Sequence, residues 1–283
     1  MEFAKVGVVG AGTMGNGIAQ ALALAGVEVV LTDVAQAQLE RAQAAIAGSL
    51  DRLVKKDKLT AEQKGEALGR IRAATELAAA KDCPLVIEAA TENVELKLKI
   101  FAQLDSLLAP QAILATNTSS ISISRLAAAT KRPDRVIGMH FFNPVPVMAL
   151  VELIRALQTS DATYAAVEAL AKKIGKTPVQ VRNSPGFVVN RMLCPMINEA
   201  VFALAEGLAS AEQIDQAMKL GANHPIGPLA LADLIGLDVE LAVMQVLFEG
   251  FKDPKYRPAP LLVEMVEAGY LGRKTKRGFF RYD

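Results

Sequence analysis

The first candidate for acid–base chemistry is a histidine in the middle of the chain. The sequence has 283 residues and only two histidines, and one of them, His140, directly follows the short apolar run 136–139. Imidazole changes its protonation state near neutral pH, so it can take a proton from an alcohol while a hydride leaves the same carbon. Position alone makes His140 a candidate base, because a buried structural histidine fits the same place.

An acidic residue twelve positions later is a candidate partner for this histidine. Glu152 stands in the apolar segment 149–154, where a buried carboxylate needs a partner. A Glu–His pair would set the tautomer of the imidazole and stabilise the imidazolium that forms when it accepts a proton. The alternative is that Glu152 points outward into solvent.

A glycine-rich turn near the start of the chain predicts dinucleotide binding. Residues 10–15 read Gly-Ala-Gly-Thr-Met-Gly and lie between a predicted strand and a predicted helix. The first glycine permits a tight turn, the second lets the backbone approach a pyrophosphate, and the third allows close packing of helix on strand. The free N–H groups at the start of the helix would bind the phosphates. An ordinary glycine-rich turn is the alternative. The predicted contacts are Gly10, Gly12, Thr13, Met14 and Gly15.

An acidic residue at the end of the next predicted strand supports this interpretation. Asp33 follows Gly15 by 18 residues, where a carboxylate can accept hydrogen bonds from the ribose hydroxyls of the adenosine. A negative charge there also repels the 2′-phosphate of NADP, and no arginine occurs in the next three residues to neutralise it. The sequence therefore predicts NAD as the cofactor in preference to NADP.

The hydrophobic periodicity places these residues in an α/β fold, a Rossmann-type doubly wound sheet with an inserted helical hairpin. Short apolar runs predict strands at 5–9, 27–32, 85–89, 112–116, 136–139 and 149–154, with an edge strand at 178–181. Helical periods predict a helix over 14–25 and the two helices of the hairpin over 36–54 and 60–68. In such a sheet, ligands bind at the carboxyl ends of the strands, which is where His140 is expected.

The last third of the chain predicts a separate, all-helical domain. From residue 184 onward the strand pattern stops, and helical periods cover 188–206, 211–220 and 229–251. A polar residue, a proline and a glycine fall together at 183–186. We therefore expect a NAD-binding domain over 1–184 and a helical domain for substrate binding and dimerisation over 185–283.

Composition excludes several classes of partner. Hydrophobic residues make up 52% of the chain, and 31 basic against 30 acidic residues leave a net charge of +1, so no basic field attracts nucleic acid or membranes. The chain has no apolar run long enough for a membrane helix and no basic leader before its first apolar run. The two cysteines, Cys83 and Cys194, suggest neither a disulfide nor a metal site. A cytoplasmic enzyme of small soluble ligands is the expectation.

Several separated motifs together resemble a known family. They are Gly-Ala-Gly-Thr-Met-Gly at 10–15, Ala-Thr-Asn-Thr-Ser-Ser at 115–120, Gly-Met-His-Phe-Phe-Asn-Pro-Val-Pro at 138–146, Asn-Ser-Pro-Gly-Phe at 183–187 and Gly-Arg-Lys-Thr-Lys-Arg-Gly-Phe at 272–279. In this order they resemble the L-3-hydroxyacyl-CoA dehydrogenases over nearly the whole chain, and most of all the bacterial short-chain members. The resemblance implies oxidation of an L-3-hydroxyacyl-CoA to the 3-ketoacyl-CoA with NAD, and the reverse reduction, by an enzyme that pairs through its helical domain. No hydratase-like segment accompanies these motifs, so we expect a stand-alone enzyme.

The resemblance also implies roles for particular residues. His140 would be the general acid and base, and Glu152 would orient it. Ser119 would hydrogen-bond the reacting oxygen and the nicotinamide side, and Asn190 would hold the substrate from the helical domain, so that the site spans the cleft between the two domains. Without the resemblance, Ser119 would be a turn hydroxyl and Asn190 a helix-surface amide.

Further cofactor contacts follow from the same resemblance. Glu92 and Lys97 would lie near the ribose, Asn143 near the nicotinamide, and Asn117 in the same binding region. Glu92 and Lys97 could otherwise be an ordinary surface ion pair, which would contribute less than about 1 kcal/mol.

A basic cluster in the predicted hairpin suggests a site for the phosphates of CoA. It consists of Arg52, Lys55, Lys56 and Lys58, with Arg52 and Lys56 one turn apart on one helix face. A solvated helix face is the alternative, since most charge runs have no ligand. Arg52 and Lys56 are the residues we assign to substrate binding.

Two other functions remain open on the sequence alone. The same fold and the same His–Glu pair could oxidise a free hydroxy acid or a sugar acid. A requirement for the CoA thioester would distinguish a hydroxyacyl-CoA dehydrogenase from this alternative. The chain could also be a catalytically silent dinucleotide-binding protein, against which the joint presence of Ser119, His140, Glu152 and Asn190 argues. The second histidine, His224, is assigned no chemistry.

Overall fold

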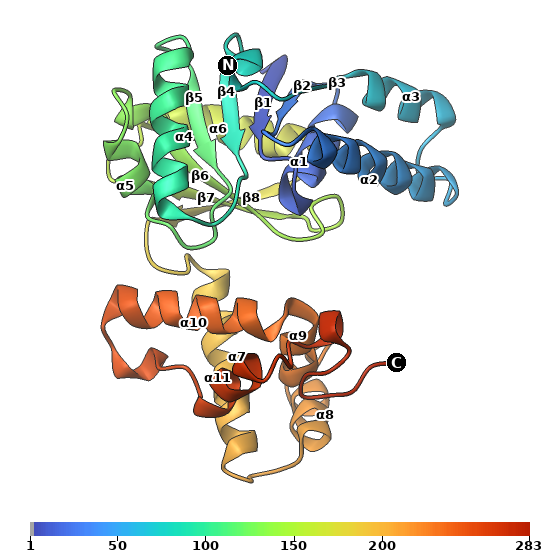
Figure 1. The fold of residues 1–283 in the computed structure, drawn as a ribbon, viewed down its shortest axis with the longest axis vertical. Coiled ribbons are helices and arrows are strands. Elements are labelled where there is room, and N and C mark those ends of the chain that lie inside the picture. The colour runs from blue at the N-terminus through green and yellow to red at the C-terminus, as the bar shows by residue number, and fades with distance from the viewer. Residues whose placement is uncertain (1–2) are drawn as a thin grey trace. The chain divides into compact units, whose positions relative to one another are not determined.

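The structure is a computed structural model that describes residues 3–283, and these fold as two compact units (Figure 1). The first unit ends at Asn183 and the second covers Ser184–Asp283. This junction lies one residue from the boundary expected between residues 184 and 185. Each unit has an apolar core of its own, as expected of a domain.

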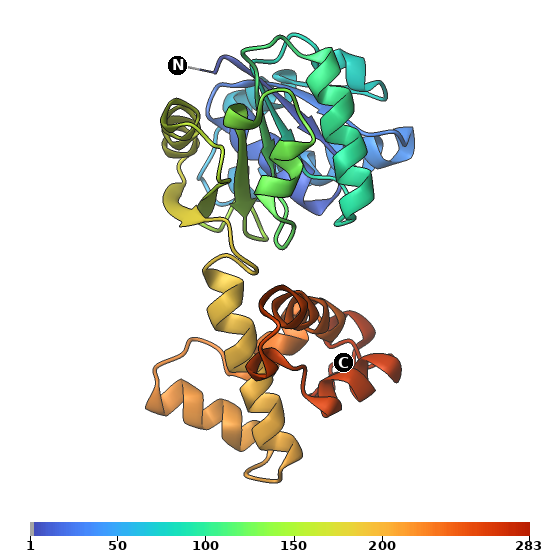
Figure 2. The same ribbon diagram turned by 90° about the vertical axis from the view of Figure 1, so that its left-hand side faces the viewer.

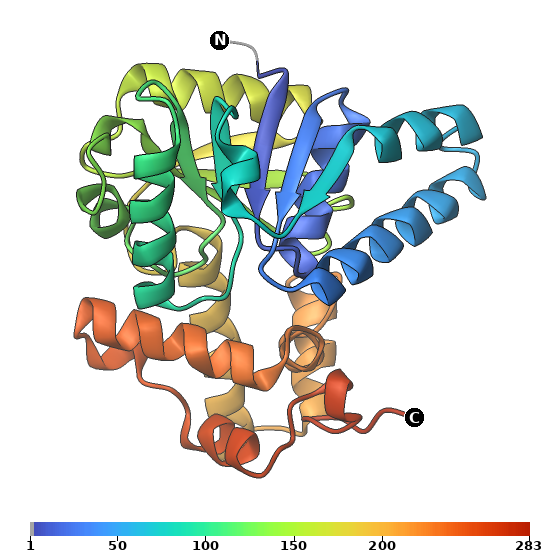
Figure 3. The ribbon, with the colours of Figure 1, turned by 45° about the horizontal axis from the view of Figure 1, so that its top comes forward.

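The first unit is built on an eight-stranded sheet in the order β3-β2-β1-β4-β5-β6-β7-β8 (Figure 3). The strands are β1 (Lys5–Val9), β2 (Glu28–Thr32), β3 (Ile71–Ala74), β4 (Leu85–Glu88), β5 (Ile113–Thr116), β6 (Val136–Phe141), β7 (Leu150–Arg155) and β8 (Thr177–Arg182). All neighbours are parallel except β6 and β7, which are antiparallel. The first six strands have the order of a doubly wound dinucleotide-binding sheet, so the predicted Rossmann-type fold is confirmed.

The central strands form where the sequence has short runs of Val, Ile and Leu. Every residue of β4, β5 and β6 is buried. Parallel strands covered on both faces need such continuous apolar runs. The edge strand β3 was not predicted, because its four residues, Ile-Arg-Ala-Ala, are only partly buried and carry little strand signal. The strand at the opposite edge, β8, lies where an edge strand was expected.

Helices cover both faces of this sheet. They are α1 (Thr13–Leu24), α2 (Gln36–Val54), α3 (Ala61–Gly69), α4 (Val94–Leu107), α5 (Ile123–Ala128) and α6 (Asp161–Lys173), with short 3-10 turns η1 (Leu77–Ala80) and η2 (Pro133–Arg135). Buried residues of α1, α2 and α6 share one core with β1 and β2. Helix α4 lies on the other face (Figures 1 and 3).

The predicted helical hairpin is present between β2 and β3 and projects beyond the sheet (Figure 3). Helix α3 begins with a capping box, in which Thr60 and Gln63 each accept a hydrogen bond from the other's backbone N–H. The end of α2 differs from the prediction. The helix stops at Val54, and Lys56 lies in the following turn, so the expectation that Arg52 and Lys56 share a helix face was wrong.

The second unit is helical, as predicted (Figure 2). It contains α7 (Val189–Ala205), α8 (Ala211–Gly221), α9 (Pro228–Ile235), α10 (Leu237–Phe251) and α11 (Pro260–Glu267), with 3-10 turns η3 (Pro254–Tyr256) and η4 (Arg273–Thr275). The predicted single helix 229–251 is two helices, because the chain breaks at Gly236, whose φ is +105°. No helix among residues 3–283 is long and apolar enough to cross a membrane.

The C-terminal tail is tied to α9 by one buried carboxylate. Asp233 accepts hydrogen bonds from the backbone N–H groups of Phe279 (3.0 Å) and Phe280 (2.9 Å) and from the hydroxyl of Tyr282 (2.9 Å). A Cβ on Gly278 would lie 1.8 Å from a carboxylate oxygen of Asp233, so only glycine fits there. These contacts give the glycine-containing basic segment near the C-terminus a role in closing the helical unit.

Candidate active site

The turn between β1 and α1 has the geometry of a phosphate-binding turn. Gly10 has a φ of +96°, which is strained for any residue with a side chain. A Cβ on Gly15 would lie 1.7 Å from the carbonyl oxygen of Gly10, so the start of the helix and the turn can approach closely only with glycine there. A Cβ on Gly12 would meet nothing within 4 Å, and no side chain caps α1. The first N–H groups of α1 are therefore accessible to the pyrophosphate of a dinucleotide.

Asp33 lies beside this turn, directly after β2. Its carboxylate accepts hydrogen bonds from the backbone N–H groups of Ala11 (2.9 Å) and Ala35 (3.0 Å). These two bonds orient the carboxylate, and each of its oxygens keeps a further lone pair for a ribose hydroxyl. The side chain fits the role of ribose acceptor that its spacing predicts.

The turn and Asp33 border one pocket of about 610 Å³, a volume suited to a cofactor. Of the predicted contacts in the turn, Gly15 alone does not line it, since it packs against Gly10 instead. The sequence did not predict the other residues that line this pocket. They include Thr75, Leu77, Leu96, Ile100 and Gln103.

Two different signals were available for these missed residues. Thr75 and Leu77 follow β3, so missing that strand concealed them. Leu96 and Ile100 are apolar residues one turn apart on α4, and Leu96 is 40% exposed. Two apolar side chains at this spacing on a helix that follows the carboxyl end of β4 form an apolar strip on the wall of this pocket.

His140 and Glu152 form a buried pair at the same edge of the sheet. The antiparallel register of β6 and β7 places the two residues directly opposite each other. His140 Nδ1 lies 2.7 Å from Glu152 Oε2, and the side chains are 8% and 1% exposed. The alternative that Glu152 points outward is therefore wrong. With the Nδ1 proton donated to the carboxylate, Nε2 is the basic nitrogen of the imidazole.

The strand ends next to His140 are tied together by Asn117. Its side-chain oxygen accepts a hydrogen bond from the backbone N–H of Phe141 (2.9 Å), and its backbone N–H donates to the backbone carbonyl of Glu88 (2.7 Å). Asn117 therefore joins the carboxyl ends of β4, β5 and β6. These contacts give it a structural role next to the His–Glu pair.

The loop that carries Ser119 is organised around the carboxylate of Glu92. That carboxylate accepts hydrogen bonds from the N–H groups of Ser119 (2.9 Å) and Ser120 (3.2 Å), and from the hydroxyls of Ser120 (2.9 Å) and Thr118. The hydroxyl of Ser119 lies 3.3 Å from the same oxygen. Burial raises the pKa of Glu92, but the positive charge of Lys97 and these hydrogen bonds outweigh burial, so the pKa lies below its ordinary value. Glu92 is therefore ionised at neutral pH.

Lys97 is not part of a surface pair. Its side chain is 1% exposed, and its ammonium lies 3.5 Å from Glu92 and 2.6 Å from Glu88. Glu88, the last residue of β4, was missed by sequence reasoning because it appears as one acidic residue at the end of an apolar run. Buried charges are tolerated when they are paired, and Glu88 supplies that pairing.

The other predicted site residues lie elsewhere in the described structure. Asn143 is exposed in the loop after β6, and Asn190 is the second residue of α7 in the helical unit. Arg52 and Lys56 are exposed near the tip of the hairpin. Among residues 3–283, no group of three or more His, Cys, Asp or Glu side chains is arranged to hold a metal ion.

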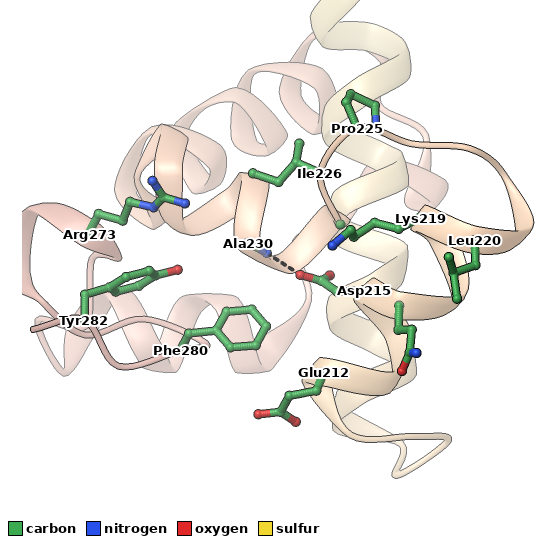
Figure 4. A pocket seen from close by; sticks show the side chains of 12 residues that line it. Glu212, Asp215, Lys219, Leu220, Pro225, Ile226, Ala230, Arg273, Phe280 and Tyr282 are labelled. Atoms are coloured by element: carbon green, nitrogen blue, oxygen red, sulfur yellow. Dashed lines mark hydrogen bonds between the residues drawn. The ribbon is translucent and has the colours of Figure 1, made fainter.

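A second pocket of about 610 Å³ lies inside the helical unit, between α8, α9 and the C-terminal tail (Figure 4). Asp215 points into it but is engaged in capping α9, where it accepts the N–H of Ala230 (2.9 Å). Glu212, Lys219 and Arg273 bring both signs of charge to the wall. None of the predicted site residues lines this pocket, so the chemistry is assigned to the sheet edge.

The phosphate-binding turn, the acid after β2 and the His–Glu pair at the same sheet edge define a Rossmann-type dehydrogenase that uses a nicotinamide dinucleotide. Comparison with known families agrees with this class. Residues 5–184 match the model of the 3-hydroxyacyl-CoA dehydrogenase NAD binding domain, and residues 186–282 match that of the 3-hydroxyacyl-CoA dehydrogenase C-terminal domain. The chain belongs to the 3-hydroxyacyl-CoA dehydrogenase family, and its cofactor is NAD.

Individual proteins resemble the chain over nearly its full length. The 3-hydroxybutyryl-CoA dehydrogenase of Bradyrhizobium diazoefficiens is 58% identical over 98% of this chain and 95% of that protein. The protein of the same name from Clostridioides difficile is 53% identical over 99% of each chain. The crystal structure of (S)-3-hydroxybutyryl-CoA dehydrogenase from Ralstonia eutropha matches with a TM-score of 0.97 and 64% identity, covering 100% of both chains.

Proposed function

We propose that this NAD-dependent dehydrogenase oxidises short-chain L-3-hydroxyacyl-CoA, in particular 3-hydroxybutyryl-CoA, to the 3-ketoacyl-CoA, and reduces acetoacetyl-CoA in the reverse direction. The observation that carries the proposal is the buried contact of 2.7 Å between His140 Nδ1 and Glu152 Oε2 at the carboxyl edge of a dinucleotide-binding sheet. The choice of a short-chain substrate is supported by the names of the relatives at 53% and 58% identity.

In the proposed mechanism, His140 moves the proton. NAD, when bound, supplies the hydride acceptor for oxidation. Nε2 of His140 takes the proton of the substrate hydroxyl, and Glu152 holds the imidazole through Nδ1 and stabilises the imidazolium. In the direction of reduction, the same imidazolium returns the proton to the developing alkoxide. The low exposure of both side chains strengthens their interaction and excludes bulk water from the proton transfer.

Other residues are proposed to position the two ligands. Ser119 would donate a hydrogen bond to the reacting oxygen, because it follows β5, the strand next to β6. Asn190 would hold the substrate from the helical unit, and Asn143 would contact the nicotinamide end of the cofactor. Glu92 would contact the ribose, and the burial of Lys97 indicates that it supports Glu92 rather than touching the cofactor.

The exposed basic cluster near the tip of the hairpin is proposed to bind the phosphates of CoA. Arg52 and Lys56 remain available there for a polyanion. Replacing Lys56 by Ala is expected to raise KM for acetoacetyl-CoA by roughly three- to tenfold with little change in kcat, and the effect should shrink at high salt. Lys172→Ala is the matched control, because this lysine is also exposed at the surface, on α6. An unchanged KM for Lys56→Ala would remove this residue from the CoA site.

The proposed activity is tested by following NADH consumption with acetoacetyl-CoA, longer 3-ketoacyl-CoAs, free acetoacetate and NADPH in parallel. We expect the highest kcat/KM with acetoacetyl-CoA and NADH. Comparable rates with free acetoacetate would favour an enzyme of free hydroxy acids. No turnover with any ketone, together with tight NADH binding, would indicate a catalytically silent dinucleotide-binding protein.

We also propose that the enzyme is a homodimer joined through its helical unit and works in the cytoplasm. Large apolar side chains on that unit are exposed in the single chain, including Met192 (71%), Leu208 (78%) and Leu220 (77%). The two free cysteines are buried, which suits a reducing compartment. Sedimentation equilibrium of the full chain tests the dimer, and a monomer at micromolar concentration would contradict it.

A further inference from the structure

A buried charge network extends from the end of β4 to the loop that carries Ser119. Glu88 is fully buried, and its Oε1 accepts hydrogen bonds from the ammonium of Lys97 (2.6 Å) and the N–H of Ala90 (2.7 Å). Its Oε2 accepts the hydroxyl of Thr116 (2.7 Å). The network therefore joins β4, α4 and β5 at the edge of the sheet where the proposed chemistry takes place.

Lys97 stands between two carboxylates that have different surroundings. Glu88 is completely buried, whereas the side chain of Glu92 is 39% exposed and binds the loop 118–120. Lys97 lies nearer to Glu88, at 2.6 Å against 3.5 Å for Glu92. Glu92 Oε1 accepts the hydrogen bonds of the loop, and Oε2 faces Lys97 at 3.5 Å. Because Glu88 supplies the closer counter-charge, Glu92 is not drawn into hydrogen-bond contact with Lys97, and its Oε1 stays on the loop.

We propose that Glu88 is a positioning residue for Ser119: it neutralises Lys97 and so leaves Glu92 to hold the backbone of Ser119 and Ser120. Without the charge of Glu88, the buried ammonium of Lys97 has Glu92 as its remaining counter-ion. The carboxylate of Glu92 is then drawn toward Lys97, and the N–H groups of Ser119 and Ser120 lose their acceptor. This inference rests on the proposed function in one respect, the contact of Ser119 with the reacting oxygen.

The variant that isolates the charge is Glu88→Gln. The glutamine side chain has nearly the same shape, its oxygen can still accept from Lys97 and Ala90, and its amide can donate to Thr116. Asp105→Asn is the matched control, because Asp105 forms a buried ion pair with Arg132 in the same unit (2.8 Å) but contacts neither Glu92 nor Ser119.

Amide hydrogen exchange tests the inference without any assumption about activity. In Glu88→Gln, the N–H groups of Ser119 and Ser120 are expected to exchange at least about tenfold faster, while Asp105→Asn leaves them unchanged. The double variant Glu88→Gln/Lys97→Met removes both charges and should restore their protection. Unchanged exchange in Glu88→Gln, or lost protection in the double variant, would overturn the proposal. If Glu88→Gln alone does not fold, the double variant still tests the proposal, because lost protection of Ser119 and Ser120 in it would overturn the proposal.

Kinetics then test whether the positioning acts through Ser119. Glu88→Gln is expected to lower kcat with acetoacetyl-CoA about tenfold with little change in KM for NADH, and to lower it less than about twofold in a Ser119→Ala background. Equal losses in the two backgrounds would show that Glu88 does not act through Ser119. If the wild-type enzyme has no activity toward acetoacetyl-CoA, the proposed function fails, and the exchange experiment still judges the role of Glu88.

Discussion

His140 and Glu152 show why a charged pair can be kept inside a sheet. Burying an imidazole and a carboxylate is unfavourable unless each has a partner of the right kind, and here the contact of 2.7 Å supplies one to each. The partners lie on neighbouring strands that run in opposite directions, so the side chains stand directly opposite each other. This arrangement holds the ring in one orientation, as a proton-transferring group requires.

Replacing His140 by Ala tests the proton-transfer role. We expect kcat for acetoacetyl-CoA reduction to fall by roughly 100- to 10,000-fold, because general acid catalysis is lost, while the dinucleotide turn is untouched. NADH binding, measured by fluorescence titration, should change little. His224→Ala is the matched control, since this histidine lies in a loop of the helical unit. Full activity of the His140 variant would remove His140 from the mechanism.

Asp33 tests cofactor preference at the same scale. Asp33→Ser should weaken NADH binding by roughly tenfold and relax discrimination against NADPH, because an acceptor for the ribose hydroxyls and a repulsive charge are both lost. The ratio of kcat/KM for the two cofactors measures the effect. An unchanged ratio would mean that Asp33 does not contact the ribose hydroxyls of the cofactor.

Among the elements, the β1–α1 turn contains one glycine that the fold requires and one that only ligand binding would require. Gly15 is required by packing, because a Cβ there would lie 1.7 Å from a backbone oxygen, whereas a Cβ on Gly12 would meet no protein atom within 4 Å. The backbone of Gly12 also has an ordinary conformation, with φ −65° and ψ −170°. Two alanine substitutions only three residues apart should therefore have different consequences.

Gly12→Ala is expected to keep the thermal stability of the apoprotein while lowering NADH affinity about tenfold or more, since its Cβ projects where the pyrophosphate binds. Gly15→Ala is expected to lower the free energy of unfolding by more than about 2 kcal/mol because of the steric overlap. Differential scanning calorimetry and NADH titration of both variants measure this. Equal NADH affinity of Gly12→Ala and wild type would place the phosphates elsewhere.

At the scale of the whole molecule, one buried acid in the helical unit links stability to pH. Glu240 on α10 is fully buried, and among residues 3–283 no N–H or O–H group donates a hydrogen bond to its carboxyl oxygens. Burial raises its pKa from 4.5 to about 8, and the neighbouring Cys194 thiol offsets only part of this rise. The folded helical unit therefore holds this carboxyl in its protonated form at neutral pH.

This shift has a definite sign for stability. Between pH 4.5 and about 8 the unfolded chain releases the proton of Glu240 and the folded chain keeps it, so stability falls as the pH rises through that range. Glu240→Gln should remove this loss. The free energy of unfolding of the variant should exceed that of wild type by an amount that grows from pH 5 to pH 8, to the order of a few kcal/mol. Urea unfolding at several pH values measures it. Glu249→Gln, exposed on the same helix, is the control, and parallel pH profiles of wild type and Glu240→Gln would contradict the shift.

Features that depend on the local backbone could be read directly from the residues. The glycines at 10, 12 and 15, the acid at 33 and the histidine at the end of an apolar run are all recognisable from their spacing along the chain. A tight turn, a helix start and a strand end impose their requirements on residues a few positions apart, so a single sequence contains the signal. The doubly wound sheet, the helical hairpin and the helical second unit followed from the same kind of pattern.

Pairing between distant segments required the folded chain. Glu88 lies 9 residues from Lys97 and 28 from Thr116, and nothing in its neighbours along the chain indicates a buried carboxylate with both partners. The same holds for the short edge strand β3, for the break at Gly236 and for the burial of Glu240. The energy of a buried charge is decided by whatever the fold brings within about 3 Å of it, and that distance has no counterpart in sequence spacing.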